Sequence, residues 1–367
     1  MKERIGVGIV GGSTSGWASL SHIPVLAASP DFALRAVSTS RASSAQAAAA
    51  QHRVTAYDHH RDLVAHPGVD LVVVAVKVTE HLKIVSDALA AGKMVYSEWP
   101  LGNGLAEAEK LAGLARETGV RTVAGLQGRY APEVRRARDL IQDGYIGEVL
   151  GTTMVGSGMV WGPEVATTGQ AYWYDKANGA TPLTSPTMHA LDPLHFVLGE
   201  FDSLAANLTV GRKQATVAED GSKVDVTVAD QVAVIGTLDS GAAASVFYRG
   251  GTSRGDNFRW EINGSEGDLV LTADWGNMQV ADLVLAGGRG TDSAVEPLAV
   301  PASYVDDVPA EVRGSVGANV ARLYAQLARD LADGTHTVPD FEHALARHRL
   351  IDTIERAAET GTTQTVR

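Results

Sequence analysis

The sequence predicts an α/β fold with a doubly wound parallel sheet in its N-terminal part. The C-terminal part is predicted to be an α+β domain with a large, mostly antiparallel open sheet. Over the first 127 residues, short apolar runs alternate with helical patterns, as expected where helices cover both faces of a parallel sheet. After Pro132, long alternating stretches with hairpin signals favour antiparallel strands. We therefore expect two domains, 1–127 and 128–367, with the last helix a candidate to pack back on the first.

Within the first domain, apolar runs bounded by turn residues are expected as strands. They are Ile5–Val10, Leu34–Ser38, Leu71–Val76, Met94–Ser97 and Val123–Leu126. Helices are expected between them, at about Gly16–Ala28, Ala42–Gln51, His81–Ala91 and Leu105–Glu117. Gly92 and Gly119 end the last two helices.

The second domain is expected to begin with the amphipathic helix Pro132–Asp143. Its clearest hairpin is Gln231–Tyr248, which turns at Asp239-Ser240-Gly241. Two further strands and two late helices complete the expected elements: Phe258–Ile262, Asp268–Leu271, Val316–Ala332 and Phe341–Glu359.

Composition excludes several classes of function. The 367 residues carry a net charge of −12 and form no basic stripe, which argues against a nucleic-acid partner. There is no cysteine, so disulfides, thiolate catalysis and cysteine-ligated metals are excluded. No histidine has a coordinating spacing with carboxylates, and we predict no metal site. Apolar runs are too short to cross a membrane and no signal-peptide core is visible, so a cytoplasmic protein is expected.

A glycine-rich loop follows the first strand and opens a helix. It reads Gly11-Gly12-Ser13-Thr14-Ser15-Gly16-Trp17, in which Gly11 and Gly16 have the first-to-third spacing of a dinucleotide loop but Ser13 fills the middle position. Glycines allow close backbone approach, and a helix N-terminus favours a pyrophosphate. The pattern predicts the nucleotide loop of a Rossmann domain; a purely structural turn is the alternative.

The end of the second strand informs on cofactor choice. NAD-selective domains usually place Asp or Glu there, to accept hydrogen bonds from the ribose hydroxyls. This chain has Ser38-Thr39-Ser40-Arg41, whose hydroxyls and guanidinium suit a 2′-phosphate. We therefore expect NADP(H) to be preferred, with NAD(H) as the other candidate. The alternative is a helix cap followed by a solvated arginine.

Several segments together resemble the Gfo/Idh/MocA family of sugar and inositol dehydrogenases. They fall in order over nearly the whole chain: Val69–Val76, His81, Ala91-Gly92-Lys93, Ser97-Glu98-Trp99-Pro100-Leu101, Gln127-Gly128-Arg129-Tyr130-Ala131-Pro132, Gly144-Tyr145-Ile146-Gly147 and Gly264-Ser265-Glu266-Gly267-Asp268-Leu269. Gly16-Trp17-Ala18, Glu98-Trp99 and Leu126–Arg129 are most similar to the branch that contains the yeast galactose-pathway repressor and its bacterial look-alikes. The resemblance implies further cofactor contacts from Val76, His81, Glu98, Trp99, Pro100 and Gln127.

Two positions depart from the pattern of the dehydrogenases. The resemblance implies Glu-Lys-Pro where this chain has Glu98-Trp99-Pro100, and a tryptophan cannot titrate. It also implies an Asp four residues before a His, and threading that pattern puts Ser185 at the Asp and His189 at the His. Of these three catalytic groups, His189 remains.

Candidate ligand residues in the second domain each have a plain structural alternative. His189 has the right type for acid–base work, and Tyr174 is nominated to assist it as a second catalytic group, although either side chain could simply be buried. Arg129, Trp161, Trp173 and Tyr174 are predicted to face a substrate with His189; aromatic rings stack on sugars but also build cores. Asp192 and His195 follow His189 as a polar helix face.

The function expected is an oxidoreductase acting on a sugar-like or polyol-like alcohol or carbonyl. One alternative is a non-catalytic dinucleotide sensor that binds a protein partner, as the repressor likeness implies. Another is a tightly bound cofactor used for transient oxidation in elimination or glycoside cleavage. Alternating apolar residues in Gln231–Leu271, such as Val232, Val234, Ala244, Val246 and Tyr248, predict a sheet that covers helices on one face and a second copy on the other. We expect a homodimer or higher homo-oligomer.

Overall fold

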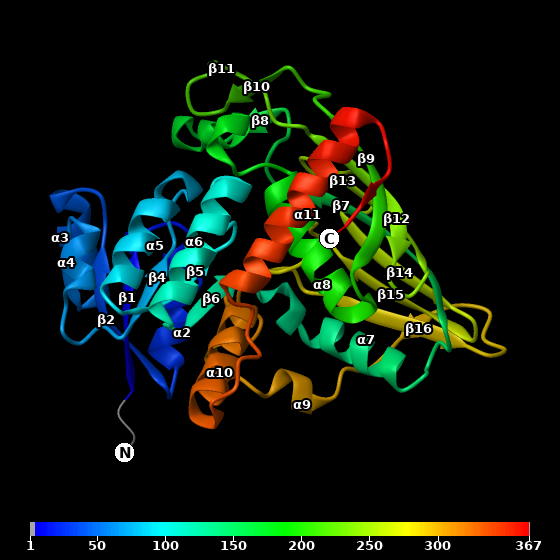
Figure 1. The fold of residues 1–367 in the computed structure, drawn as a ribbon, viewed down its shortest axis with the longest axis horizontal. Helices are drawn as coiled ribbons and strands as arrows, with labels where there is room; N and C mark the ends of the chain where they lie inside the picture. The colour runs from blue at the N-terminus through cyan, green and yellow to red at the C-terminus, as the bar shows by residue number, and fades with distance from the viewer. Residues whose placement is uncertain (1–3, 367) are drawn as a thin grey trace. The chain divides into compact units, whose positions relative to one another are not determined.

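The computed structural model describes residues 4–366, which divide into two compact units. Unit 1 contains the chain as far as Gln127 together with Asp306–His348, drawn in blue, cyan and orange in Figure 1. Unit 2 contains Gly128–Val305 and the chain from Arg349 onward. The first unit is therefore made of two segments that are far apart in the sequence.

A parallel six-stranded sheet forms the centre of unit 1 among the described residues, in the order β3-β2-β1-β4-β5-β6. The strands are β1 (Ile5–Val10), β2 (Phe32–Ser38), β3 (Thr55–Tyr57), β4 (Leu71–Val74), β5 (Met94–Glu98) and β6 (Thr122–Gly125). Strand order reverses on either side of β1, so the carboxyl ends of β1 and β4 border the crevice where doubly wound sheets bind ligands. The predicted parallel fold is confirmed; the short strand β3 was not predicted.

The helices of unit 1 connect these strands. They are α1 (Trp17–Leu20), α2 (His22–Ala28), α3 (Ala42–His52), α4 (His60–Val64), η1 (Val78–Glu80), α5 (His81–Ala90) and α6 (Leu105–Thr118). The single helix expected over Gly16–Ala28 is wrong, because α1 and α2 are separated at Ser21. Pro24 explains the break: it has no N–H to give the carbonyl of Leu20, and its ring would clash with that carbonyl in a continuous helix.

The late segment of unit 1 consists of η6 (Ala310–Val312), α10 (Ala318–Asp333) and the first part of α11 (Phe341–Thr360). It is held to the sheet domain by specific bonds. The Tyr324 hydroxyl on α10 lies 3.0 Å from Nδ1 of His22, and the N–H of Ala124 donates to the carbonyl of Pro339. These contacts explain why residues distant in sequence belong to the first unit.

Unit 2 is built on a sheet that has nine strands within the described chain, in the order β17-β16-β15-β14-β7-β13-β12-β9-β18. They are β7 (Val149–Gly158), β9 (Phe201–Thr209), β12 (Gln231–Leu238), β13 (Ala243–Gly250), β14 (Phe258–Gly264), β15 (Gly267–Ala273), β16 (Val284–Arg289), β17 (Glu296–Pro297) and β18 (Gln364–Thr365). The β7–β13 pair is parallel and the other neighbouring pairs are antiparallel. This confirms the predicted mostly antiparallel sheet.

A smaller sheet and several helices complete unit 2. The small sheet has the order β11-β10-β8, with β8 (Glu164–Val165), β10 (Gln214–Val217) and β11 (Lys223–Asp225). The helices are η2 (Gln127–Tyr130), α7 (Pro132–Gln142), η3 (Thr168–Tyr174), η4 (Lys176–Asn178), the π-helical turn η5 (Leu183–Thr187), α8 (Met188–Leu198) and α9 (Ala302–Val305). The small sheet was not predicted.

Over residues 4–366, none of the helices combines the length and apolar character needed to cross a membrane. The same residues include no group of His, Asp and Glu side chains arranged to hold a metal ion.

Candidate functional site

The glycine-rich loop lies at the carboxyl end of β1 and leads into α1. A Cβ at Gly11 would lie 2.2 Å from the carbonyl oxygen of Ala75, and its φ of 95° is one that other residues rarely adopt. The N–H groups of Gly11 and Gly12 both donate to the carbonyl of Ser38. Within the loop, the Ser13 hydroxyl donates to the carbonyl of Ser15 at 2.6 Å. The loop is therefore pinned to β2 and β4 by its first two residues, while Thr14, Ser15 and Gly16 are exposed.

The predicted ribose-binding segment follows β2 at the same edge of the sheet. Ser38 ends the strand and is buried, whereas Ser40 and Arg41 are exposed. The Thr39 hydroxyl donates to the carbonyl of Arg41 at 3.1 Å. The Ser44 hydroxyl lies 2.9 Å from both the Thr39 hydroxyl and the Arg41 carbonyl oxygen, and these bonds fix the turn into α3. Arg41 occupies the N-cap position of α3, and its side chain is exposed.

At the ends of β4 and β5, His81 and Trp99 lie in a buried environment. His81 Nε2 is 3.2 Å from the carbonyl oxygen of Val76, and its Nδ1 is 3.3 Å from the Ser97 hydroxyl. Burial lowers the pKa of His81, so the imidazole is neutral near pH 7. The His81 contact with Val76 is a hydrogen bond at the start of α5, which is the structural alternative to a cofactor contact.

Trp99 packs against a residue that sequence reasoning missed. Its ring centroid is 4.8 Å from that of His348 on α11. Burial, with a smaller contribution from His81, lowers the pKa of His348 to about 3. The position at which the resemblance implies a lysine is thus a tryptophan that packs on His348, whose imidazole is neutral near pH 7.

Glu98, Pro100 and Gln127 complete the predicted cofactor residues of unit 1. Glu98 is the last residue of β5, and its Oε1 accepts a hydrogen bond from His22 Nε2 at 2.7 Å. Pro100 is buried, and Gln127 follows β6 and is also buried. All the residues predicted to touch a dinucleotide therefore gather at the carboxyl edge of one parallel sheet.

This edge fits a dinucleotide on three counts. Its loop meets the strands through backbone alone at Gly11, it carries no acidic residue from Ser38 to Arg41, and two of its polar atoms lack partners. Ser38 Oγ and Gln127 Oε1 are buried without a hydrogen-bond partner among the described residues. A buried polar atom without a partner costs roughly 1–3 kcal/mol, so both are candidates to be satisfied on ligand binding.

In unit 2, His189 lies in the first turn of α8, directly after the π-helical turn η5 that contains Ser185. π-helical turns are rare and occur frequently at functional sites. His189 is buried, 7% exposed. The turn at Gly128 packs on this helix, because a Cβ there would lie 3.1 Å from the carbonyl oxygen of His189 and 3.0 Å from Pro193.

Arg129 is held by a bidentate ion pair with Asp192. Its Nε and Nη2 lie 2.9 and 2.5 Å from the two carboxylate oxygens, and its guanidinium lies 5.1 Å from the ring centroid of Phe196. Burial lowers the pKa of Arg129, but the Asp192 charge outweighs it and raises the pKa overall. The observed role of Arg129 is to fasten η2 to α8, one turn after His189.

The surroundings of Tyr174 contradict the prediction that it is a catalytic residue. Its side chain is fully buried in a core cluster with Trp161, the small-sheet residues Val165, Ala215 and Val217, and Val226 and Val228, which follow β11. Its hydroxyl donates to the carbonyls of Gly162 and Glu164, and burial raises its pKa. A hydroxyl committed to two backbone carbonyls in a core is not positioned to transfer a proton to a ligand.

Trp161 and Trp173 also contribute to this packing. Trp161 is 4% exposed, and its indole N–H donates to the carbonyl of Trp173 at 2.8 Å. Trp173 is half-buried, packs against the same cluster and lies 5.3 Å from the ring of Tyr172. Of the predicted aromatic substrate residues, only Trp173 keeps a partly exposed ring.

Comparison with known proteins assigns both parts of the chain. Residues 5–126 match the Gfo/Idh/MocA group, described as "Oxidoreductase family, NAD-binding Rossmann fold". Residues 132–273 match "Gal80p, C-terminal domain". A dehydrogenase named aclE from Aspergillus oryzae is 30% identical over 375 residues, which cover 98% of each chain.

The chain belongs to the Gfo/Idh/MocA oxidoreductase family. Within this family, the galactose/lactose metabolism regulatory protein GAL80 of Saccharomyces cerevisiae is 28% identical over 99% of this chain and 94% of its own. A crystal structure of a super-repressor mutant of Gal80p superposes with a TM-score of 0.88 over 99% of each chain, at 26% identity. Levoglucosan dehydrogenase of Pseudarthrobacter phenanthrenivorans is 23% identical over 73% of this chain and 74% of its own. The relatives of this family member thus include both dehydrogenases and a regulator.

Proposed function

We propose that this protein is an NADP(H)-dependent oxidoreductase acting on a sugar-like or polyol-like alcohol or carbonyl. The observation that carries the proposal is the position of His189, buried in the first turn of α8 directly after a π-helical turn. An imidazole there offers a nitrogen that can take or return the proton of a substrate hydroxyl. The names of the dehydrogenase relatives support this class of reaction.

The dinucleotide would be held by the loop Gly11–Trp17, by Ser38–Arg41 and by the strand ends at Val76, His81, Glu98, Trp99, Pro100 and Gln127. When bound, it would supply or accept the hydride. Arg41 would donate charge-assisted hydrogen bonds to a 2′-phosphate, which is the basis for preferring NADP(H) over NAD(H). Trp99 would supply an apolar wall that excludes water, and His189 would handle the proton. Arg129 would keep its ion pair with Asp192 and so hold the segment next to α8.

A regulatory function is the second candidate, and a specific feature of unit 2 favours it. Met159 and Trp275 are exposed apolar side chains, and their loops are joined by a hydrogen bond from the N–H of Met159 to Asn277 Oδ1. Gly158, which precedes Met159, packs near Pro186 of the π-helical turn. Exposed apolar side chains on two joined loops would suit a dinucleotide sensor that binds a protein partner, and the name of the GAL80 relative supports a regulatory function.

A substrate panel distinguishes these functions. Aldoses, polyols and glycosides are incubated with the protein and each dinucleotide, and the nicotinamide absorbance is followed. We expect turnover with at least one aldose or polyol. Cleavage of a glycoside without net change in absorbance would instead support transient oxidation by a retained cofactor. Binding of dinucleotide with no turnover of any compound would contradict the enzyme proposal and favour the sensor.

We also propose that the protein forms a homodimer through the outer face of the nine-stranded sheet. The residues named from the sequence, Val232 and Val234 among them, are buried on the inner face of β12 and β13. The opposite face carries Ile235, which is 59% exposed, and the partly exposed Phe247. Light scattering at micromolar concentration should give twice the monomer mass, and Ile235→Lys should lower it. A monomeric wild type would contradict the proposal.

A further inference from the structure

Three side chains from distant parts of unit 1 form one chain of hydrogen bonds. Glu98 at the end of β5 accepts from His22 Nε2 at 2.7 Å, and His22 Nδ1 lies 3.0 Å from the hydroxyl of Tyr324 on α10. His22 is fully buried and the Glu98 side chain is 12% exposed. This series of hydrogen bonds therefore connects the interior of unit 1 to the side chain of Glu98, at the C-terminal end of β5.

The direction of these bonds follows from the groups themselves. Burial raises the pKa of Tyr324 well above its usual value, and the Glu98 charge adds to the shift, so the hydroxyl keeps its proton. An ionised Glu98 can only accept, so the proton between it and His22 resides on Nε2. Tyr324 can then donate to Nδ1 of His22. Together these bonds select one tautomer and one ring orientation for His22.

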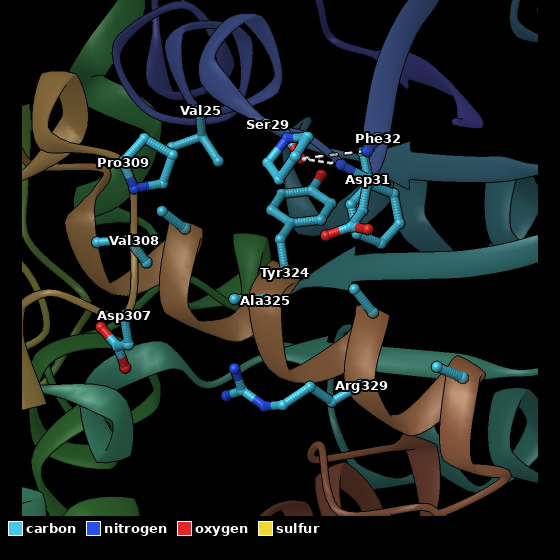
Figure 2. A pocket seen from close by; sticks show the side chains of 14 residues that line it. Val25, Ser29, Asp31, Phe32, Asp307, Val308, Pro309, Tyr324, Ala325 and Arg329 are labelled. Carbon is cyan, nitrogen blue, oxygen red and sulfur yellow. Dashed lines mark hydrogen bonds between the residues drawn. The ribbon is translucent and has the colours of Figure 1, made fainter. Parts of the chain in front are cut away.

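Packing restricts the same three side chains. The His22 ring meets Tyr96 edge-on, with centroids 5.0 Å apart, and Tyr324 lies 5.1 Å from Phe32. Figure 2 shows Tyr324 projecting from α10 toward Phe32, in the wall of a pocket of about 340 Å³. On the other side of Glu98, a Cβ at Gly125 would lie 3.0 Å from Oε2, so β6 approaches the carboxylate closely. The His22 hydrogen bond restricts Oε1 of Glu98, and the close approach of β6 restricts Oε2.

We propose that His22 and Tyr324 are positioning residues that hold the Glu98 carboxylate in the orientation needed to bind the dinucleotide. This rests on the proposed function, in which the carboxyl edge of the sheet is the dinucleotide site. The next residue is Trp99, so no lysine charge is available to orient Glu98 from its own strand. The orientation is instead set from α2 and α10. A carboxylate fixed before binding loses less freedom when it accepts a ligand hydroxyl or amide.

Titration calorimetry with NADPH and NADH tests this on the full chain. Tyr324→Phe removes one hydroxyl and keeps the ring, and we expect dinucleotide affinity to fall roughly fivefold, as for loss of one neutral hydrogen bond. His22→Leu removes the donor to Glu98 and should weaken binding more than tenfold. His22→Gln retains an N–H that can reach Glu98 and should recover part of the loss.

A second His–carboxylate pair in unit 1 provides the matched control. His60 Nε2 lies 2.7 Å from Asp87 Oδ2, the same distance as in the His22–Glu98 pair, but it connects α4 to α5. His60→Gln should change dinucleotide affinity by less than about twofold. Side-chain ¹⁵N spectra should also assign the proton of His22 to Nε2 in the wild type, and Tyr324→Phe should alter the Nδ1 shift.

The outcomes distinguish failure of the positioning role from failure of the proposed function. If the wild type binds neither dinucleotide, the proposed function fails, and the positioning role fails with it. If the wild type binds and a folded Tyr324→Phe variant binds equally well, the positioning role is wrong while the proposed function stands. Should His22→Leu not fold, Tyr324→Phe and the ¹⁵N spectra still decide the question.

Discussion

The carboxyl edge of the unit 1 sheet and the aromatic cluster of unit 2 were both predicted to contact a ligand, but they are built differently. At the edge, the predicted residues end or follow parallel strands, and parallel strands end together. In the aromatic cluster, Trp161 and Tyr174 are buried in a core, and their N–H and hydroxyl groups donate hydrogen bonds to backbone carbonyls. Topology places a strand-end residue at a site, whereas an aromatic residue acquires a role only from its surroundings.

His189 lies in unit 2 but outside the aromatic cluster, and its replacement should have the largest effect. His189→Ala should lower turnover of the true substrate by about 10²- to 10⁴-fold, as for loss of a positioned acid–base group. NADP(H) affinity should be unchanged, because the predicted cofactor residues lie in unit 1. Steady-state kinetics and calorimetry on the same preparation measure both quantities. Unchanged turnover would remove His189 from the mechanism.

How much could be predicted follows the same division. The glycine-rich loop, the strand ends and the antiparallel sheet were visible because their signals are local periodicities and turn residues. The helix break before Pro24 also has a local signal, the proline itself. His348 and the His22–Tyr324 contact had no such signal, since His22 and Tyr324 are 302 residues apart. Only the return of α10 and α11 to unit 1 brings them to the edge.

Arg41 offers the next largest effect and tests the edge alone. Arg41→Ala should weaken NADP(H) binding by roughly tenfold or more, since a charge-assisted hydrogen bond contributes on the order of 1.5–3 kcal/mol. NAD(H) affinity should change little, because NAD(H) has no 2′-phosphate. The residue is exposed, so stability should be unaffected. Calorimetry with both dinucleotides decides this, and equal affinity of the wild type for NADP(H) and NAD(H) would refute the preference.

The lowered pKa of His348 predicts that the free energy of unfolding depends on pH. Its pKa is lowered to about 3 in the folded state, against about 6.5 when unfolded, so between these values the unfolded chain binds the extra proton. The folded state therefore loses stability as pH falls, by about 2 kcal/mol from pH 7 to pH 5.

Denaturant unfolding at the two pH values measures this loss in the wild type and in His348→Gln. The variant does not titrate and should show a smaller decrease. Part of the decrease should remain, because burial also lowers the pKa of His81. Identical pH dependence of the two proteins would show that His348 is not buried in its neutral form.

Tyr174 gives the smallest expected effect and tests the other side of the comparison. Tyr174→Phe removes a hydroxyl that donates to the carbonyls of Gly162 and Glu164, and should lower the free energy of unfolding by about 1–2 kcal/mol. Turnover and dinucleotide affinity should be unchanged, because the hydroxyl is confined to the core. Tyr172→Phe is the comparison, since the Tyr172 side chain is only half-buried and removal of its hydroxyl should cost less than removal of the Tyr174 hydroxyl. If Tyr174→Phe instead lowered turnover without changing stability, the cluster would be part of the site after all, and burial would be the wrong criterion for separating the two regions.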